Sequence, residues 1–85
     1  MSFAVRYGSR MNLQAAVAIA KDHVSKLFAA DSPRDLKLES FLYDDHLMVW
    51  SLTIGFLGAG PDAVRITRLV RVSEADMVVL SVADP

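Results

Sequence analysis

The chain has 85 residues, no cysteine, and nine basic against ten acidic residues, for a formal net charge of −1. This length fits one domain over residues 1–85, near the lower limit at which a single core is stable. The lack of cysteine excludes disulfides and thiolate metal sites and predicts a cytoplasmic protein, while the near-neutral charge speaks against nucleic acid as a partner. No apolar run approaches the roughly 20 residues that span a bilayer, so we expect no membrane association.

Residues 1–11 leave two interpretations open. Phe3, Val5 and Tyr7 alternate with Ala4 and Arg6 as in a short strand, and Gly8 and Ser9 then end the pattern. Both an edge strand and a loose tail fit this stretch.

An amphipathic helix is predicted over residues 12–30. Asn12 is a good N-cap residue, and the stretch Asp31-Ser32-Pro33 ends the helix because proline disfavours helical backbone at the residue before it. Apolar residues recur at spacings of three and four on the face expected to be buried, namely Leu13, Ala16, Val17, Ala20, Val24, Leu27 and Phe28.

The segment 36–43 is predicted to be a strand, with Leu36, Leu38 and Leu42 facing the core. A three-residue loop over 44–46 would pair Leu42 with Met48 and Leu38 with Leu52. That register keeps the leucines on the same side as the apolar row of the following strand.

The most apolar and most clearly periodic stretch is residues 46–56, which we predict to be the central strand. Every second residue is a large apolar one, so that one face of this strand must be covered by the helix. These residues are Met48, Trp50, Leu52, Ile54 and Phe56.

Two more strands are predicted after a glycine-rich turn. Residues 63–73 are rich in β-branched side chains and place Val64, Ile66, Val70 and Val72 inward, with Arg68 as the exception. The last strand covers 77–82, with Val78, Leu80 and Val82 inward. The fold class is therefore α+β, with one helix packed across a four-stranded antiparallel meander sheet.

The turn Gly58-Ala-Gly60-Pro-Asp-Ala63 satisfies the pattern G-x-G-x-x-A directly after a strand. In a dinucleotide-binding fold a helix would follow it, and residues 62–73 can also be drawn as one. A small-ligand or nucleotide-binding protein that uses Gly58 and Gly60 is thus the alternative function. The β-branched content and the short chain favour a glycine-rich hairpin loop instead.

Other polar clusters suggest no chemistry. Asp44, Asp45 and His46, with Glu39 on the neighbouring strand, are of the types that bind a divalent ion or act as acid and base, but adjacent turn residues point apart. Arg65, Arg68 and Arg71 fit a solvated edge, with Arg68 paired to an acid such as Glu39. We therefore expect no catalytic, cofactor-binding or metal site, and no enzyme.

The sheet face away from the helix is predicted to carry an apolar patch. A monomer rarely exposes such a patch, so we expect it to be covered by residues 3–7, by a second copy in a homodimer, or by a partner protein. Its members are Phe41, Tyr43, Leu47, Val49, Leu69, Met77 and Val79.

One long helix followed by a curled antiparallel meander resembles the cystatin-like and PepSY-type arrangement. The stretch Trp50-Ser-Leu-Thr53-Ile-Gly-Phe56, with Leu38-Glu39 before it and Arg68-Leu-Val-Arg-Val72 after it, is similar to small bacterial proteins of unknown function with a Trp-x-Val-Thr-x-x-Phe core strand. The resemblance covers residues 12–82 and implies no catalytic residues. The inhibitory Gln-x-Val-x-Gly loop of cystatins is absent. The expected function is a non-catalytic interaction or accessory module that self-associates.

Overall fold

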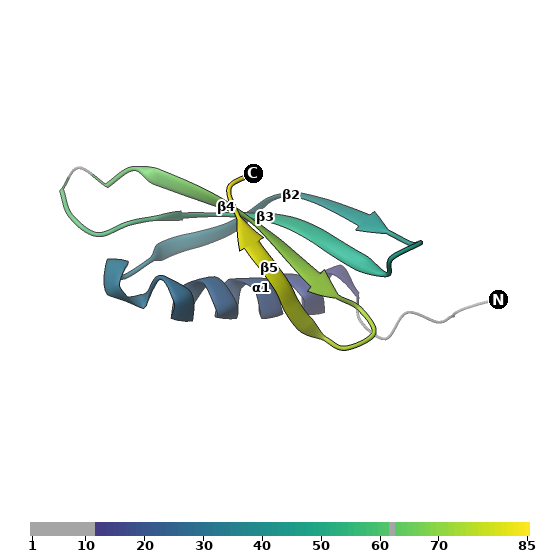
Figure 1. Ribbon diagram of the computed structural model, residues 1–85. Coiled ribbons are helices and arrows are strands. Elements are labelled where there is room, and N and C mark those ends of the chain that lie inside the picture. Colours follow the sequence, from purple (N-terminus) through teal and green to yellow (C-terminus); the bar gives the residue numbers. More distant parts are fainter. Residues whose placement is uncertain (1–11, 62) are drawn as a thin grey trace.

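A computed structural model describes residues 12–61 and 63–85 as one helix followed by four strands (Figure 1). The strands are antiparallel and neighbour each other in chain order, which confirms the predicted α+β meander. The prediction of an edge strand or loose tail over 1–11 lies outside the described residues. The elements are α1 (Leu13–Leu27), the 3-10 turn η1 (Ala29–Asp31), β2 (Arg34–Asp44), β3 (Val49–Leu57), β4 (Arg65–Ser73) and β5 (Val78–Ala83).

Helix α1 begins where its N-cap residue predicts. The side-chain oxygen of Asn12 accepts a hydrogen bond from the backbone N–H of Ala15 at 2.9 Å, which satisfies one of the free donors of the first turn. The α-helix ends at Leu27 and tightens into η1, and Ser32 then adopts a left-handed backbone (φ 47°) just before Pro33. The α-helix therefore ends three residues before the predicted end at residue 30, and the 3-10 turn η1 covers the remainder.

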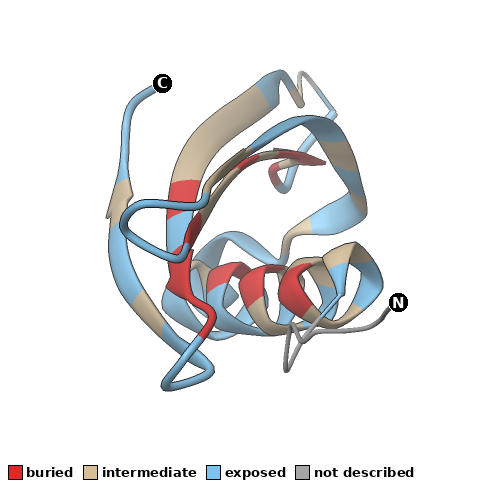
Figure 2. Cartoon of the chain, turned by 90° about the vertical axis from the view of Figure 1, so that its right-hand side faces the viewer, coloured by how far each residue is buried: buried red, intermediate tan, exposed pale blue. Residues whose placement is uncertain are grey.

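The core lies between α1 and the concave face of the sheet, which curls around the helix (Figure 2). Two small alanines on α1 let the helix approach the sheet closely, and the ring of Phe28 lies 5.2 Å from that of Phe56. The predicted inner row of β3 is confirmed for its last three members, and Trp50 packs half-buried against the same core. The fully buried residues are Ala16, Ala20, Val24, Leu52, Ile54, Phe56, Val70 and Val72.

A β-bulge at Glu39 changes the predicted facing of β2. Leu38 pairs with Ile54 and Ser40 with Thr53, so Glu39 is an extra residue and the alternation is inverted after it. Phe41 and Tyr43 consequently lie on the helix side, opposite Leu52 and Trp50, whereas Leu42 lies on the outer face opposite Ser51. The predicted three-residue loop is also wrong, because four residues, 45–48, connect β2 to β3.

A bulge at Leu80 does the same to β5. Arg71 pairs with Ser81 and Val72 with Val79, which leaves Leu80 as the extra residue. Val79 therefore packs against the core, while Leu80 is 54% exposed and Val78 is also exposed. The predicted inner positions of Val78 and Leu80 are wrong, and that of Val82 is confirmed.

The glycine-rich turn leads into a strand, not a helix. Of the predicted strand over 63–73, residues 65–73 form β4 and pair with β3 along its whole length. Val64, predicted to face inward, lies before the strand and is exposed. Gly60 adopts a positive φ of 103°, a backbone that glycine takes without strain. The helix start on which dinucleotide binding depends therefore does not follow this turn. Among the described helical residues, none forms a helix long and apolar enough to cross a bilayer.

Candidate interaction surface

The seven residues predicted to form an outer apolar patch lie in different places. Phe41 and Tyr43 are on the helix side of the sheet, and Val79 packs against the core. Val49 does lie on the outer side but is only 6% exposed, between its pairing partners Asp44 and Ser73. Leu69 faces outward, and Leu47 and Met77 lie in the two hairpin loops at one end of the sheet.

The outer face of the sheet is instead mostly polar. The bulges leave Leu42 and Leu80 there, separated by strands whose outward residues are mainly serine, threonine and arginine. Such scattered leucines are ordinary on an exposed antiparallel face. The outward polar residues are Ser40, Ser51, Thr53, Thr67, Arg71 and Ser81.

Four of the exposed apolar residues, Leu47, Met48, Met77 and Val78, lie in or beside the two hairpin tips, residues 45–48 and 74–77. Both tips have the same sequence pattern, in which a side-chain acceptor is followed by three residues and then by Met-Val. In the first tip, Asp44 Oδ1 accepts hydrogen bonds from the backbone N–H groups of His46 (2.9 Å) and Leu47 (3.1 Å). In the second, Ser73 Oγ accepts one from the backbone N–H of Asp76 at 3.2 Å. The two loops are thus built alike.

Each tip ends in a methionine with a left-handed backbone. Met48 has φ 55° and Met77 has φ 56°, a region in which a side chain costs roughly 1–2 kcal/mol and which glycine or asparagine usually occupies. The two methionines thus occupy matching positions of the two loops, in a backbone conformation that favours glycine.

The two tips are neighbours at the end of the molecule where α1 begins (Figure 1). The backbone N–H of Glu74 donates to the carbonyl of Met48 at 2.9 Å, which joins the loops directly. We define the hairpin-tip surface as Leu47, Met48, Met77 and Val78, which are 61%, 44%, 49% and 47% exposed. Sequence reasoning identified Leu47 and Met77 but missed Met48 and Val78; the repeated Met-Val pattern is the signal that would have found them.

Behind the tips, a hydrogen bond from Tyr43 to Glu74 ties β2 to the second loop. The hydroxyl of Tyr43 donates to Glu74 Oε1 at 2.7 Å, and Glu74 is buried, with only 2% of its surface exposed. This hydrogen bond, together with burial, raises the pKa of Tyr43 to about 12. The ring of Tyr43 also lies 4.7 Å from that of Trp50, so the loop end is anchored to the core.

Carboxylates surround the hairpin-tip surface. Asp44, Asp45 and Asp76 lie in or beside the two loops, which contain no lysine or arginine, whereas Glu74 of the second loop is buried. The ion pairs between described residues lie elsewhere on the molecule, for example Lys26–Asp22 on α1 and Arg68–Asp84. Arg68 thus pairs with Asp84 and not with Glu39, and its guanidinium lies 5.5 Å from the centre of the Phe28 ring.

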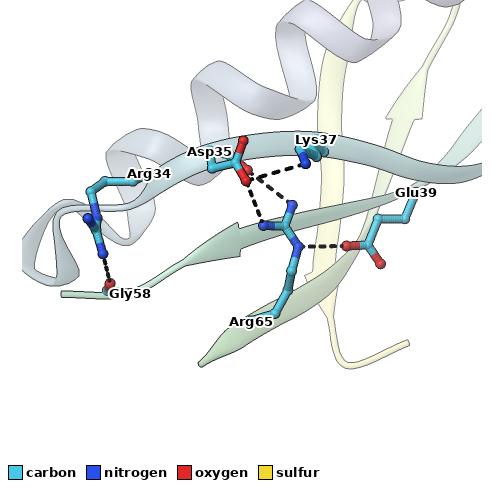
Figure 3. A network of polar contacts seen from close by, with 6 residues as sticks. All are labelled: Arg34, Asp35, Lys37, Glu39, Gly58 and Arg65. Carbon is cyan, nitrogen blue, oxygen red and sulfur yellow. Dashed lines mark hydrogen bonds and ion pairs between the residues drawn. The ribbon is translucent and has the colours of Figure 1, made fainter. Parts of the chain in front are cut away.

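A polar network crosses the outer face of the sheet (Figure 3). Arg65 on β4 donates from Nε to Glu39 at 3.1 Å and from Nη1 to Asp35 Oδ2 at 3.1 Å, and Lys37 lies 3.4 Å from the same Asp35 oxygen. The Glu39 carboxylate passes over Gly55 of β3, where a Cβ atom would collide with it. Because Gly55 has no Cβ atom, the Glu39 carboxylate of β2 can cross β3 and pair with Arg65 of β4.

The structure does not assemble the predicted polar cluster into a site. Glu39 is engaged by Arg65, and the Asp44 carboxylate closes its own turn. Within residues 12–61 and 63–85, no group of three or more metal-ligating side chains gathers. His23 lies on α1 beside a hollow of about 390 Å³ lined also by Met77, while His46 lies in the first tip.

No known protein family, curated protein or solved structure matches this chain. The resemblance to cystatin-like and PepSY-type proteins therefore gains no support from these comparisons.

Proposed function

We propose that this protein is a non-catalytic interaction module that binds a partner protein through the hairpin-tip surface. The observation that carries the proposal is the pair of left-handed methionines, Met48 and Met77, at matching positions in adjoining loops. Methionine is flexible and polarisable, and it adapts to varied partner surfaces. Contact of both side chains with a partner would offset the free-energy cost of their left-handed backbone.

The charge around the tips favours a partner other than a second copy. In a symmetric dimer the same patch meets itself, so Asp45 and Asp76 of one copy would face the same carboxylates of the other. Like charges brought together at an interface are costly. The partner surface is therefore apolar at its centre and carries basic residues at its rim.

The test compares the variant Met48→Gly/Met77→Gly with the wild-type protein. Glycine relieves the left-handed backbone and keeps the loops closed, so the variant stays folded while it loses both side chains. A photoreactive amino acid at Leu47 in host cells would capture the partner, and binding would then be measured with both purified proteins.

A matched control, Leu42→Ser/Leu80→Ser, removes two exposed leucines from the outer face. We expect the control to bind as the wild type does and the methionine variant to lose most of its affinity. Equal affinity of all three proteins would refute the proposal. Nucleotide binding by Gly58 and Gly60 stays a prediction, and the strand that follows them offers it no support.

A further inference from the structure

A hollow of about 430 Å³ lies between one flank of α1 and the edge strand β2. Its lining residues are Leu13, Gln14, Val17, Ala18, Lys21 and Leu38. Those from α1 recur at spacings of three and four, which places them along one side of the helix. The volume is within the range of roughly 300–1,000 Å³ that is usual for small-molecule sites.

The hollow is aliphatic along its walls and basic at one end. Its lining contains leucine, valine and alanine but no carboxylate, and Lys21 lies at the end farthest from the helix start. Lys21 is partly buried and forms no ion pair with any described residue, whereas Lys26 on the same helix is exposed and lies 3.0 Å from the carboxylate of Asp22. An apolar wall that ends in an unpaired cation is complementary to an amphiphile with one negative charge. A single lysine suits a carboxylate, since anionic phospholipid headgroups are usually bound by clusters of about four to eight basic residues.

Carboxylates of the neighbouring elements do not compete for Lys21. Asp35 and Glu39 of β2 are held by Arg65 on the outer face of the sheet (Figure 3). On the other flank of α1, the hollow of about 390 Å³ is lined by Asp22, whose charge repels an anion. The flank beside β2 is therefore the one that an anionic ligand prefers.

The length of the hollow sets the size of the ligand. From Leu13 to Lys21 the helix advances about 12 Å, at 1.5 Å per residue. An extended alkyl chain with C–C bonds of about 1.5 Å covers this distance with about ten carbon atoms. We propose that the hollow binds a medium-chain fatty acid, with its alkyl chain along Val17 and Leu38 and its carboxylate paired with the Lys21 ammonium. The site shares no residue with the hairpin-tip surface and is independent of that proposal.

The first test measures fatty-acid binding to the purified full-length protein by isothermal titration calorimetry, below micelle-forming concentrations. We expect one decanoate per chain, and an affinity that rises about two- to fourfold for each CH₂ added between hexanoate and decanoate, because each methylene leaves water. Decyltrimethylammonium, which has the same chain with a positive charge, should bind more weakly. Amide chemical shifts should change at Leu13, Val17 and Leu38. Absence of decanoate binding, or shift changes confined to other residues, would overturn the proposal.

The second test places a negative charge in the hollow. Ala18→Glu introduces a carboxylate at an exposed position of the lining, so the affinity for decanoate should fall about tenfold or more. The matched control, His23→Glu, introduces the same residue on the other flank of α1 and should bind decanoate as the wild type does. Glutamate is a good helix former, and circular dichroism verifies that both variants keep the fold. Equal decanoate affinities of the two variants would contradict the proposal.

The third test concerns the charge of Lys21. Lys21→Gln should weaken decanoate binding about two- to fivefold without weakening that of decyltrimethylammonium. An unchanged affinity for decanoate would show that Lys21 does not pair with the carboxylate. A second copy of the chain is the competing occupant. If decanoate does not bind and the wild type sediments as a dimer that Ala18→Glu dissociates, a second copy covers the hollow and the proposal is wrong.

Discussion

Backbone conformation and side-chain identity disagree at two residues of the hairpin tips. Met48 and Met77 have left-handed φ values in loops that glycine would close with less strain. At Tyr43 and Gly55, in contrast, the residue type matches its surroundings closely. These four positions give predictions that concern single side chains.

Substitutions at Met48 should rank glycine above alanine. Both substitutions remove the half-exposed side chain, but only glycine relieves the left-handed backbone. The free energy of unfolding of Met48→Gly should therefore be about 1 kcal/mol higher than that of Met48→Ala. Urea unfolding measures the difference. At Thr53, within a regular strand, the order should be reversed by about 0.5–1 kcal/mol, because there glycine adds only chain entropy. If alanine were more stable than glycine at Met48 as well as at Thr53, the backbone at Met48 would be unstrained.

The hydrogen bond between Tyr43 and Glu74 should make stability depend on alkaline pH. Folding raises the pKa of Tyr43 from 10.0 to about 12, because its hydroxyl donates to the Glu74 carboxylate. The raised pKa means that the folded state retains the proton more strongly than the unfolded state. Its contribution is therefore complete below pH 10 and is lost between about pH 10 and 12. Melting temperatures of wild type and Tyr43→Phe should converge across this range, and parallel curves would contradict the assignment.

The close approach of Glu39 to Gly55 should appear as coupling between the two residues. An alanine at Gly55 pushes the Glu39 carboxylate away from Arg65, which costs about 1 kcal/mol or less because the pair is partly exposed. In a Glu39→Ala background the obstacle is gone, so Gly55→Ala should be neutral or slightly stabilising. A double-mutant cycle by urea unfolding measures the coupling, and additive effects would show that the carboxylate does not occupy this space.

The helix, the four strands and their order follow from periodicity, capping and turn residues. Asn12 fixes the start of α1, and the alternating row from Leu52 to Phe56 fixes the buried face of β3. The bulges at Glu39 and Leu80 do not follow from these signals. A bulge inserts one residue without changing composition, so strict alternation places Phe41, Tyr43 and Val79 on the wrong face.

The inverted facing of β5 gives a direct test of its bulge. Strict alternation predicts that Leu80 is buried and Val79 exposed, whereas the structure packs Val79 against the core. Val79→Lys should therefore cost about 2–3 kcal/mol, and Leu80→Lys should stay within about 0.5 kcal/mol of the wild type. Thermal unfolding of the two variants compares them, and the opposite ranking would restore the regular register.

The errors in predicted facing explain why the candidate surface was only partly predicted. An apolar patch on the outer face requires Phe41, Tyr43 and Val79 to point outward, and the bulges turn all three inward. Leu47 and Met77 belong to the predicted patch because alternation places them on the outer faces of the predicted strands 46–56 and 77–82, whereas the structure places both in hairpin loops. Val49→Lys, a natural choice for disrupting an outer-face dimer, would instead place a charge at a buried position.

At the scale of the whole molecule, the two ends of the sheet differ in charge. At the hairpin tips, Asp45 and Asp76 have no basic neighbour in their own loops, whereas at the other end Asp35 and Glu39 are paired with Arg65 and Lys37. Repulsion between tips should therefore hold two copies apart even though four apolar side chains are exposed there.

Neutralising the tips should allow copies to associate. We expect Asp45→Asn/Asp76→Asn to show a concentration-dependent rise in mass by sedimentation equilibrium at low salt, while the wild type shows less. Asp31→Asn, which removes an exposed acid near the far end of α1, serves as the control and should behave as the wild type. If the double variant and the control sediment alike, charge does not determine the choice of partner.

The irregular edge strand β2 limits how copies of this protein can pair along the open edge of the sheet. An edge of 11 residues is long enough to template further strands, yet its first half carries Arg34, Asp35, Lys37 and Glu39, a left-handed Asp35 and two register shifts. An incoming strand cannot follow such an outline with regular hydrogen bonds. The irregularity that brings Phe41 to the helix side therefore also protects this edge of the sheet against amyloid-like growth.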